Sequence, residues 1–216
     1  RASGLDLAAK RACHVLGITL ADMPDATCCG GLVPQVKDDY KGFLAPARIL
    51  LDAHRQGYDE LVTLCAFCFN TLRRSALFLQ SHPETRARVA TFLEVDDLPE
   101  VRVVHLLEVL RDQVGFDQLR EAVRRPLKGL RVAPYYGCLL LRPAAEMRVD
   151  DPNDPTLMEG LLEVLGCEPV DFTAKSECCG SYHIVTDQDL AGARSGHVLR
   201  SAVETRVDVL VTTCPV

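Results

Sequence analysis

The sequence lacks the features that point to nucleic acid or to a membrane. Its 216 residues include 24 Lys and Arg against 30 Asp and Glu, which gives a net charge of −6 at pH 7, and no block of basic residues stands out. A nucleic-acid interface needs a basic face to neutralise phosphates. No apolar run approaches the roughly 20 residues that cross a bilayer, and no secretory signal peptide is present. We therefore expect a cytoplasmic protein without a transmembrane segment and without a nucleic-acid partner.

Two redox motifs are also absent. The sequence has no Cys-x-x-Cys-x-x-Cys-x-x-x-Cys run of the ferredoxin type, so electrons would have to arrive from a partner protein. It has no Gly-x-Gly-x-x-Gly segment either, so we do not expect this chain to hold a flavin itself.

Cysteine, in contrast, is abundant, with ten in the chain. Small secreted proteins place cysteines in loop-rich sequences that disulfides hold together. Here the cysteines lie among stretches with helix and strand periodicity that are long enough to bury a core. In such a setting cysteines are more often metal ligands or redox groups. We therefore favour metal or cluster binding, with structural disulfides and inert buried thiols as the alternatives.

The chain repeats itself with a period near 150 residues. Three segments recur in the same order, with offsets of 149 or 150 residues: VLG at 15–17 and 164–166, CCG at 28–30 and 178–180, and LVTLC at 61–65 with LVTTC at 210–214. Such self-similarity at a fixed offset indicates an internal duplication.

Helical and strand periodicities alternate along each unit. The predicted helices are 5–16, 46–56, 69–79, 157–165 and 189–206, and the predicted strands are 18–20, 61–64, 130–136 and 207–212. Strands separated by helices of this length pair in parallel and build an α/β fold. We therefore expect two pseudo-symmetric repeats with short parallel sheets flanked by helices. Cysteines that follow strands fit the rule that sites in such sheets lie at the carboxyl ends of the strands.

The chain divides into three predicted parts. Residues 1–82 would form the first repeat, 83–127 a connector and 128–216 the second repeat. The connector is predicted to hold a helix at 84–93, a strand at 101–104, and helices at 106–111 and 117–123.

Eight cysteines form two sets with similar spacing: Cys28, Cys29, Cys65 and Cys68 in the first, and Cys138, Cys178, Cys179 and Cys214 in the second. Adjacent cysteines point different ways, so they chelate one small ion poorly but suit different irons of one cluster. Soft thiolates select iron–sulfur clusters or zinc. Neither repeat has the paired Cys-x-x-Cys spacing of a zinc knuckle, which favours a cluster. A thioredoxin-like interpretation of Cys65 and Cys68 would leave Cys28 and Cys29 unused.

Gly30 and Gly180 follow the two cysteine pairs and are candidate cofactor-binding residues. A glycine lets the backbone pass close to an inorganic core, and its amide could donate a hydrogen bond to a cluster sulfur. The alternative is that both are simple turn glycines. Cys13 and Cys167 lie outside the pattern, and we expect them to be buried thiols at helix ends.

At these residues the chain resembles the CCG-domain family, and within it the B subunit of heterodisulfide reductases. The resemblance rests on four motifs besides the triplets: CAFCFN at 65–70, HLLEVL at 105–110, PLKGL at 126–130 and YYGCLLLRP at 135–143. It covers essentially the whole chain.

The resemblance implies two non-cubane [4Fe-4S] clusters, each held by five cysteines, with a disulfide substrate cleaved between them. The two sets of four cysteines would be their ligands, and each set is then one ligand short. We expect the first to be completed by a cysteine about a dozen residues before Arg1, and the second by the residue after Val216.

The activity that the resemblance implies is that of the iron–sulfur catalytic subunit of a heterodisulfide reductase. It would cleave a disulfide of the CoM-S-S-CoB type, or another disulfide. Electrons would come from a ferredoxin-type iron–sulfur protein like the C subunit of such reductases and from a flavoprotein like their A subunit. The alternative is a non-catalytic electron-transfer subunit, as in relatives that serve succinate, glycolate or lactate oxidation. A zinc-stabilised scaffold is a third possibility.

His183 departs from the small residues that the resemblance leads us to expect after the second triplet. We interpret it as a candidate catalytic residue that would protonate a leaving thiolate, with a surface or packed histidine as the alternative. The other five histidines lie in helical or connector stretches and need no role.

Overall fold

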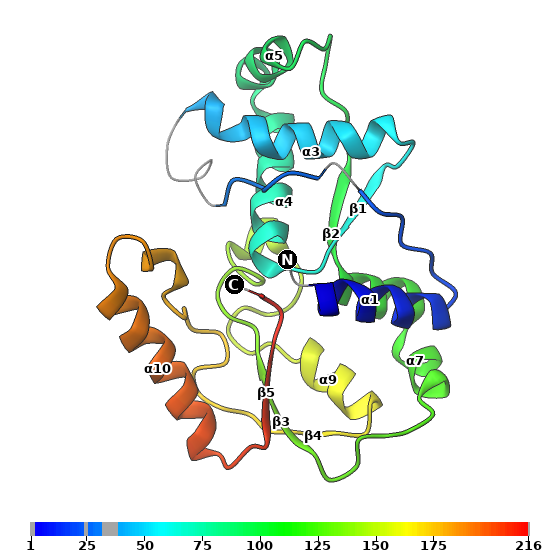
Figure 1. Cartoon of the computed structure of the whole chain (residues 1–216), viewed down its shortest axis with the longest axis vertical. Helices are drawn as coiled ribbons and strands as arrows, with labels where there is room; N and C mark the ends of the chain where they lie inside the picture. The colour runs from blue at the N-terminus through cyan, green and yellow to red at the C-terminus, as the bar shows by residue number, and fades with distance from the viewer. Residues whose placement is uncertain (1–2, 24–25, 32–38, 216) are drawn as a thin grey trace. The chain divides into compact units, whose positions relative to one another are not determined.

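The computed structural model describes residues 3–23, 26–31 and 39–215. The chain forms two compact units, residues 1–106 and 107–216 (Figure 1). The boundary between them falls inside the predicted connector 83–127, which is therefore shared between the units. Arg1 and Val216, beyond which the sequence predicts two further ligands, lie outside the described residues. The predicted fold class is confirmed, since each unit combines helices with a short parallel sheet.

The regular elements described in the first unit are α1 (Ser3–Val15), a 3-10 turn η1 (Tyr40–Phe43), α3 (Leu44–Arg55), β1 (Glu60–Thr63), α4 (Ala66–Ser81), α5 (Pro83–Phe92) and β2 (Arg102–His105). β1 and β2 pair in parallel, with Glu60 opposite Arg102 and Thr63 opposite His105. β2 comes from the predicted connector, yet it completes the sheet that leads to Cys65.

Helices α3, α4 and α5 of the first unit share one apolar core. It contains the buried residues Phe43, Ala47, Leu79, Val89, Ala90 and Leu98. Phe43 stacks on Phe78 with ring centroids 4.7 Å apart, and Figure 1 shows α3 crossing α4. This packing anchors the far end of α4, whose first turn carries Cys68.

The predicted strand at 18–20 is wrong, because these residues adopt no regular secondary structure. Two of their three counterparts by the repeat offset of 149 form β4 (Glu168–Pro169), which bonds to β3 (Arg131–Tyr135). A strand exists only where a neighbour completes its ladder, and the described part of the first unit provides no such neighbour for 18–20.

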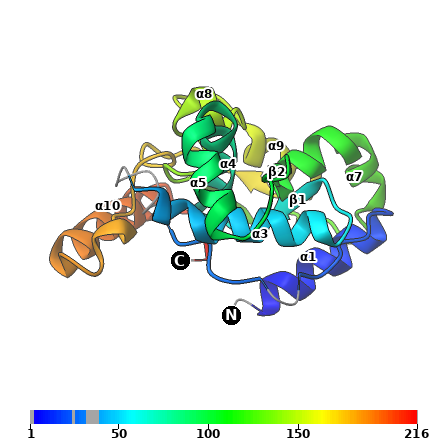
Figure 2. The ribbon, with the colours of Figure 1, turned by 90° about the horizontal axis from the view of Figure 1, so that it is seen from above.

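The second unit begins with α6 (Leu106–Glu108) at the boundary, and continues with a π-helical turn η2 (Val109–Val114), α7 (Phe116–Ala122), β3, α8 (Ala144–Met147), α9 (Leu157–Val164), β4, a 3-10 turn η3 (Ser181–His183), α10 (Gln188–Glu204) and β5 (Val209–Thr212). Among the described residues its strands are ordered β4-β3-β5, all in parallel. α7 runs beside α9 (Figures 1 and 2).

The sheet of the second unit is covered by helices on both faces (Figure 1). Val132 of β3 packs with Leu162 of α9, whereas Ala133 packs with Val198 and Ala202 of α10. Successive side chains of a strand point to opposite faces, so an apolar strand such as β3 serves both helices. This arrangement leaves the carboxyl ends of the strands as the place where cysteines gather.

The duplication is visible in how equivalent helices end. α1 closes with a bond from Ile18 N to Cys13 O (2.8 Å), and α9 closes with the equivalent bond from Cys167 N to Leu162 O (3.0 Å). The glycines between, Gly17 and Gly166, have φ of 79° and 83°. Both ends form the Schellman motif that a left-handed glycine allows, so the two helices end in the same way.

Candidate functional site

In the first unit, Cys65 and Cys68 are placed by the junction of β1 with α4. Cys65 lies two residues after β1 and is the N-cap of α4, with φ −127° and ψ 119°. Its carbonyl accepts the first helical hydrogen bond, from Phe69 N at 2.8 Å. The helix begins three residues earlier than predicted, at Ala66. Cys68 therefore lies one turn above Cys65 on the same side of the helix.

Cys29 reaches this helix start from the loop after α1. Its Sγ lies 3.5 Å from Sγ of Cys68. The hydrogen bond with Cys68, assisted by those with the Gly31 amide and the Thr71 side chain, lowers the pKa of Cys29 to about 6 against the opposing effect of burial. Hydrogen bonds with Cys29 and with Cys65 raise the pKa of Cys68. Cys28 is exposed beside this group.

His105 belongs to the first site, although the sequence analysis assigned it no role. It is the last residue of β2 and pairs with Thr63 of β1, which lies two residues before Cys65 in the sequence. Its side chain is buried, with the ring edge toward Phe69 at 5.6 Å between centroids. Burial lowers its pKa to about 4, opposed by the charge of Cys65. If the predicted strands 101–104 and 61–64 had been paired in parallel, the sequence would have placed His105 near Cys65.

In the second unit, Cys138 and Cys214 follow two neighbouring strands. Tyr135 of β3 pairs with Thr212 of β5, so the residues that follow each strand leave the same edge of the sheet. Cys214 lies two residues after β5, as Cys65 does after β1. Its amide donates to Thr212 Oγ1 at 3.3 Å.

Cys178 and Cys179 approach Cys138 from the loop before η3. Burial, followed by the charge and the hydrogen bond of Cys178, raises the pKa of Cys138 to about 12. Cys178 is exposed, and the backbone of Cys179 is tied to α10 because Ser195 Oγ donates to its carbonyl at 2.7 Å. Three thiols thus interact in the second unit, as Cys29, Cys65 and Cys68 do in the first.

Tyr135 is a second residue at these sites that the sequence analysis missed. It is buried at the end of β3, and its hydroxyl donates to Glu177 O at 2.7 Å. Burial raises its pKa, and the charge and hydrogen bond of Cys179 raise it further. The motif YYGC could have indicated Tyr135, because the residues just before a cysteine at a strand end lie in the same surroundings as that cysteine.

The two triplet glycines have the same backbone conformation. φ is 82° at Gly30 and 81° at Gly180. Residues other than glycine rarely adopt this backbone conformation. Gly180 also donates its amide to Cys178 Sγ at 3.4 Å. In the first unit the equivalent donor to a thiol is the amide of Gly31, which acts on Cys29. The role of Gly30 and Gly180 toward a cofactor stays a prediction.

His183 lies in η3, half-buried, four residues after Cys179. Its ring meets Tyr182 edge-on at 5.9 Å, and its carbonyl accepts from the amides of Thr186 and Asp187. Its catalytic role stays a prediction. Cys13 and Cys167 are buried at helix ends, as expected.

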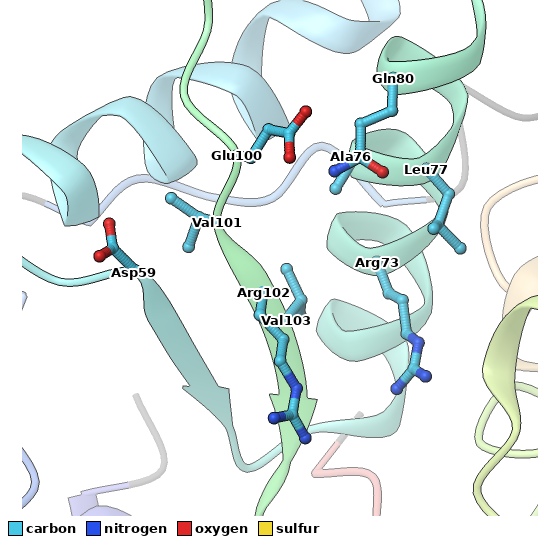
Figure 3. A pocket seen from close by; sticks show the side chains of 9 residues that line it. All are labelled: Asp59, Arg73, Ala76, Leu77, Gln80, Glu100, Val101, Arg102 and Val103. Carbon is cyan, nitrogen blue, oxygen red and sulfur yellow. The ribbon is translucent and has the colours of Figure 1, made fainter.

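A groove of about 320 Å³ lies between α4 and β2 (Figure 3). Arg73 of α4 and Arg102 of β2 extend along it in the same direction, and the carboxylates of Asp59 and Glu100 lie toward its other end (Figure 3). No cysteine lines this groove.

The donor set of each unit fits an iron–sulfur cluster. Among residues 3–23, 26–31 and 39–215, no three His, Cys, Asp or Glu side chains are grouped closely enough for a single metal ion. The thiols are instead distributed over a strand end, a glycine loop and, in the first unit, a helix start. Soft thiolates on such a frame, with backbone amides donating to sulfur, are the ligand environment of iron–sulfur clusters.

A model of the cysteine-rich CCG domain matches residues 2–73 and 132–216. The chain belongs to the CCG family. The two matched segments contain one triplet each and together hold all eight cysteines of the two sets.

Curated relatives of this CCG protein carry the names of reductase subunits. The chain is 30% identical over 231 residues to the B subunit of the ferredoxin/F420H2-dependent CoB-CoM heterodisulfide reductase of Methanosarcina acetivorans, with 100% of this chain and 73% of the relative covered. It is 29% identical over 204 residues to the 8-methylmenaquinol:fumarate reductase membrane anchor subunit of Wolinella succinogenes, covering 93% and 70%. In the part of this chain that the structure describes, no helix has the length and apolar character to cross a membrane.

A solved structure of a hypothetical protein from Helicobacter pylori shares the fold. Its TM-score is 0.71 at 13% identity, over 97% of this CCG chain and 38% of the other chain. At this identity the likeness concerns the fold alone.

Proposed function

We propose that this chain is the iron–sulfur catalytic subunit of a disulfide reductase, equivalent to the B subunit of heterodisulfide reductases and located in the cytoplasm. The observation that carries the proposal is one group of three interacting thiols in each unit: Cys29 with Cys65 and Cys68, and Cys138 with Cys178 and Cys179. The relative from Methanosarcina acetivorans, 30% identical over the whole chain, supports the same assignment.

Each unit would hold one [4Fe-4S] cluster of the non-cubane type. The proposed ligands are Cys28, Cys29, Cys65 and Cys68 for the first cluster and Cys138, Cys178, Cys179 and Cys214 for the second. When bound, the clusters supply one-electron chemistry at iron and soft sites for sulfur. Reduction of a disulfide takes two electrons and two protons and yields two thiols, so one cluster for each substrate sulfur would satisfy the balance. Electrons would come from two partner proteins, one resembling the ferredoxin-type C subunit and one resembling the flavoprotein A subunit of such reductases.

The residues around the thiols have distinct proposed tasks. The amides of Gly31 and Gly180 donate to the sulfurs of Cys29 and Cys178. At Cys29 this hydrogen bond helps to lower the pKa and so favours the thiolate form that would ligate iron. Tyr135 holds the chain just before Cys178. His183 would protonate a thiolate of the cleaved substrate, which is the last chemical step before release.

The test begins with anaerobic purification of the chain together with its partner subunits. We expect iron and acid-labile sulfide in equal amounts, and loss of about half of each in a variant that lacks the ligands of one unit. Mixing the reduced complex with CoM-S-S-CoB and with other small disulfides should release thiols and change the paramagnetic spectrum of the clusters. A loaded complex that releases no thiol from any disulfide would show that the chain is not catalytic, and zinc without sulfide would rule out the clusters themselves.

The relative from Wolinella succinogenes supports a second candidate function. In this second function the chain would be a non-catalytic electron-transfer subunit of an oxidoreductase of the succinate, glycolate or lactate type. The clusters would then be reduced and reoxidised by partners at the same rates with and without a disulfide. Thiol release therefore distinguishes the two functions directly.

A further inference from the structure

A buried ion pair joins the segment before Cys178 to α9. Lys175 is 8% exposed. Its ammonium group donates to Glu159 Oε1 of α9 at 3.1 Å and to Pro155 O at 3.0 Å. Two exposed carboxylates also lie near it, Asp171 Oδ1 at 2.9 Å and Asp154 Oδ1 at 3.3 Å. Burial opposes the charge, but the hydrogen bonds with Asp171 and Glu159 outweigh it and raise the pKa of Lys175. Lys175 is therefore a charged group inside the fold.

Tyr136 connects this ion pair to the strand that leads to Cys138. It is the residue directly after β3 and is 1% exposed. Its hydroxyl donates to Glu159 Oε2 and accepts from Met158 N at 2.6 Å. Glu159 thus accepts from Lys175 with one carboxylate oxygen and from Tyr136 with the other, so a single carboxylate links the two side chains.

The backbone of the same segment is fixed to the loop of Cys138. Lys175 O accepts from Tyr136 N at 2.9 Å and from Gly137 N at 3.2 Å. The next two carbonyls are also occupied: those of residues 176 and 177 accept from Arg142 Nη1 at 2.9 Å and from Tyr135 Oη at 2.7 Å. Three consecutive carbonyls before Cys178 are therefore held by donors from residues 135–142, the segment that carries Cys138.

We propose that Lys175 and Glu159 are positioning residues for the second cluster, fixing Cys138 relative to Cys178 and Cys179 through Tyr136 and the carbonyls of 175–177. The inference rests on the proposed cluster in the second unit, but not on its catalytic use. Outer contacts that orient metal ligands influence affinity and redox properties as the ligands themselves do. Lys175→Met leaves the carboxylate of Glu159, which is 17% exposed, without its positive partner. Glu159→Gln removes the one buried carboxylate beside Lys175, because the carboxylates of Asp154 and Asp171 are 80% and 76% exposed. In each variant the segment that carries the remaining buried charge must move.

The first unit contains a matched link that serves as a control. By the repeat offset of 149, Lys10 of α1 corresponds to Glu159 and Asp22 to Asp171. Lys10 forms ion pairs with Asp22 and with Asp6, so the helix and the loop before the triplet are again joined, with the charge on the helix reversed. These side chains are 32% (Lys10) and 70% (Asp22) exposed. Water replaces such a surface link at little cost.

The experiment compares Lys175→Met and Glu159→Gln with Lys10→Met in the complete, cluster-loaded chain. We expect iron of the second cluster to be lost to a chelator about 10-fold faster in the first two variants. Its paramagnetic signal and midpoint potential should shift, while the signal of the first cluster stays as in the wild type. Lys10→Met should leave both clusters unchanged. Wild-type signals in Lys175→Met would overturn the inference, and so would a wild-type chain that assembles no second cluster.

A second variant separates positioning from stability. Lys175→Met combined with Glu159→Leu replaces the ion pair by apolar groups, an exchange that often preserves the stability of a buried site. Tyr136 then loses its acceptor, so we expect the second signal to stay altered although the thermal unfolding temperature recovers. If the double variant has both a normal unfolding temperature and a normal second signal, the pair is merely structural and the inference is wrong. Thiol release from a disulfide is scored separately, so failure of the proposed function does not affect this result.

Discussion

The Sγ atoms of Cys29 and Cys68 lie 3.5 Å apart although 39 positions separate the two residues in the sequence. One thiol comes from a glycine loop and the other from the first turn of α4. Their hydrogen bond affects the two thiols unequally, because it lowers the pKa of Cys29 and raises the pKa of Cys68. Cys29 is therefore the more acidic thiol of the first site.

This contact predicts the reactivity of the chain after its iron has been removed. Alkylation of Cys29 should reach half its maximal rate near pH 6, because its pKa is lowered to about 6 and the thiolate is the reacting form. In Cys68→Ala the midpoint should rise toward the ordinary thiol value of 9.0. Peptide mass spectrometry after timed alkylation measures both. Cys13 is buried and should stay unmodified; equal midpoints in the two proteins would contradict the contact.

The same pKa makes a prediction for stability. A group whose pKa is lowered in the folded state stabilises the fold above its unfolded pKa, and this contribution disappears as the pH falls through the folded value. For Cys29 the window runs from about pH 9 down to about pH 6. The iron-free wild type should therefore lose more stability than Cys29→Ala across this window, as urea unfolding would measure.

The two triplet glycines should respond differently to alanine. Both have positive φ, which costs an alanine about 1 kcal/mol. A Cβ at Gly30 would meet only Ala45 Cβ at 3.6 Å, whereas one at Gly180 would meet Arg194 Cβ at 2.8 Å and Ala191 Cα at 3.1 Å. We expect Gly30→Ala to lower the unfolding free energy by about 1 kcal/mol and Gly180→Ala by about 3 kcal/mol.

The iron content of these two variants provides a second measurement. Gly180→Ala pushes the loop of Cys178 away from α10, so it should lose the second cluster selectively. Gly30→Ala should retain both clusters. Equal effects of the two substitutions would mean that close packing against α10 does not position the second triplet.

Burial of His105 predicts a pH dependence of stability in the first unit. Its pKa is lowered from 6.5 to about 4, so the unfolded chain binds the proton more readily between these values. The stability contributed by the neutral ring is present above pH 6.5 and is lost as the pH falls toward 4, by at most about 1.4 kcal/mol per pH unit. His105→Phe keeps an aromatic ring against Phe69 and removes this slope. Unfolding of the loaded protein at about pH 5 to 7.5 tests it, with His14→Gln as the control that should keep the wild-type slope.

His183 gives a prediction on catalysis alone. If its imidazole protonates the departing thiolate, His183→Gln should lower thiol release about 100-fold. Iron, sulfide and the cluster spectra should stay as in the wild type, because no described contact joins His183 to a thiol. His54→Gln, at an exposed histidine of the first unit, is the matched control. Undiminished thiol release in His183→Gln would exclude the proton transfer and leave the rest of the proposed function intact.

Most elements and the ligand candidates were predictable from the sequence because their signals are local. Apolar periodicity predicts α3, α9 and α10, and Gly17 and Gly166 mark helix ends through their own backbone freedom. The duplication and the two cysteine sets are properties of order along the chain. The expected helix start in the first unit was three residues late, because Cys65 caps α4 with its backbone rather than with a typical capping side chain.

What only the tertiary structure decided depends on residues that are distant in sequence. Strand pairing took β2 from the predicted connector into the first sheet and brought His105 to Cys65, while 18–20 stayed irregular because no described strand bonds to it. Burial made a charged pair of Lys175 and Glu159, and packing put Tyr135 against Cys179. The sequence determined by itself which thiols follow strands and which precede glycine turns. Which thiols meet, and how strongly each holds its proton, followed from desolvation and from hydrogen bonds that exist only in the folded chain.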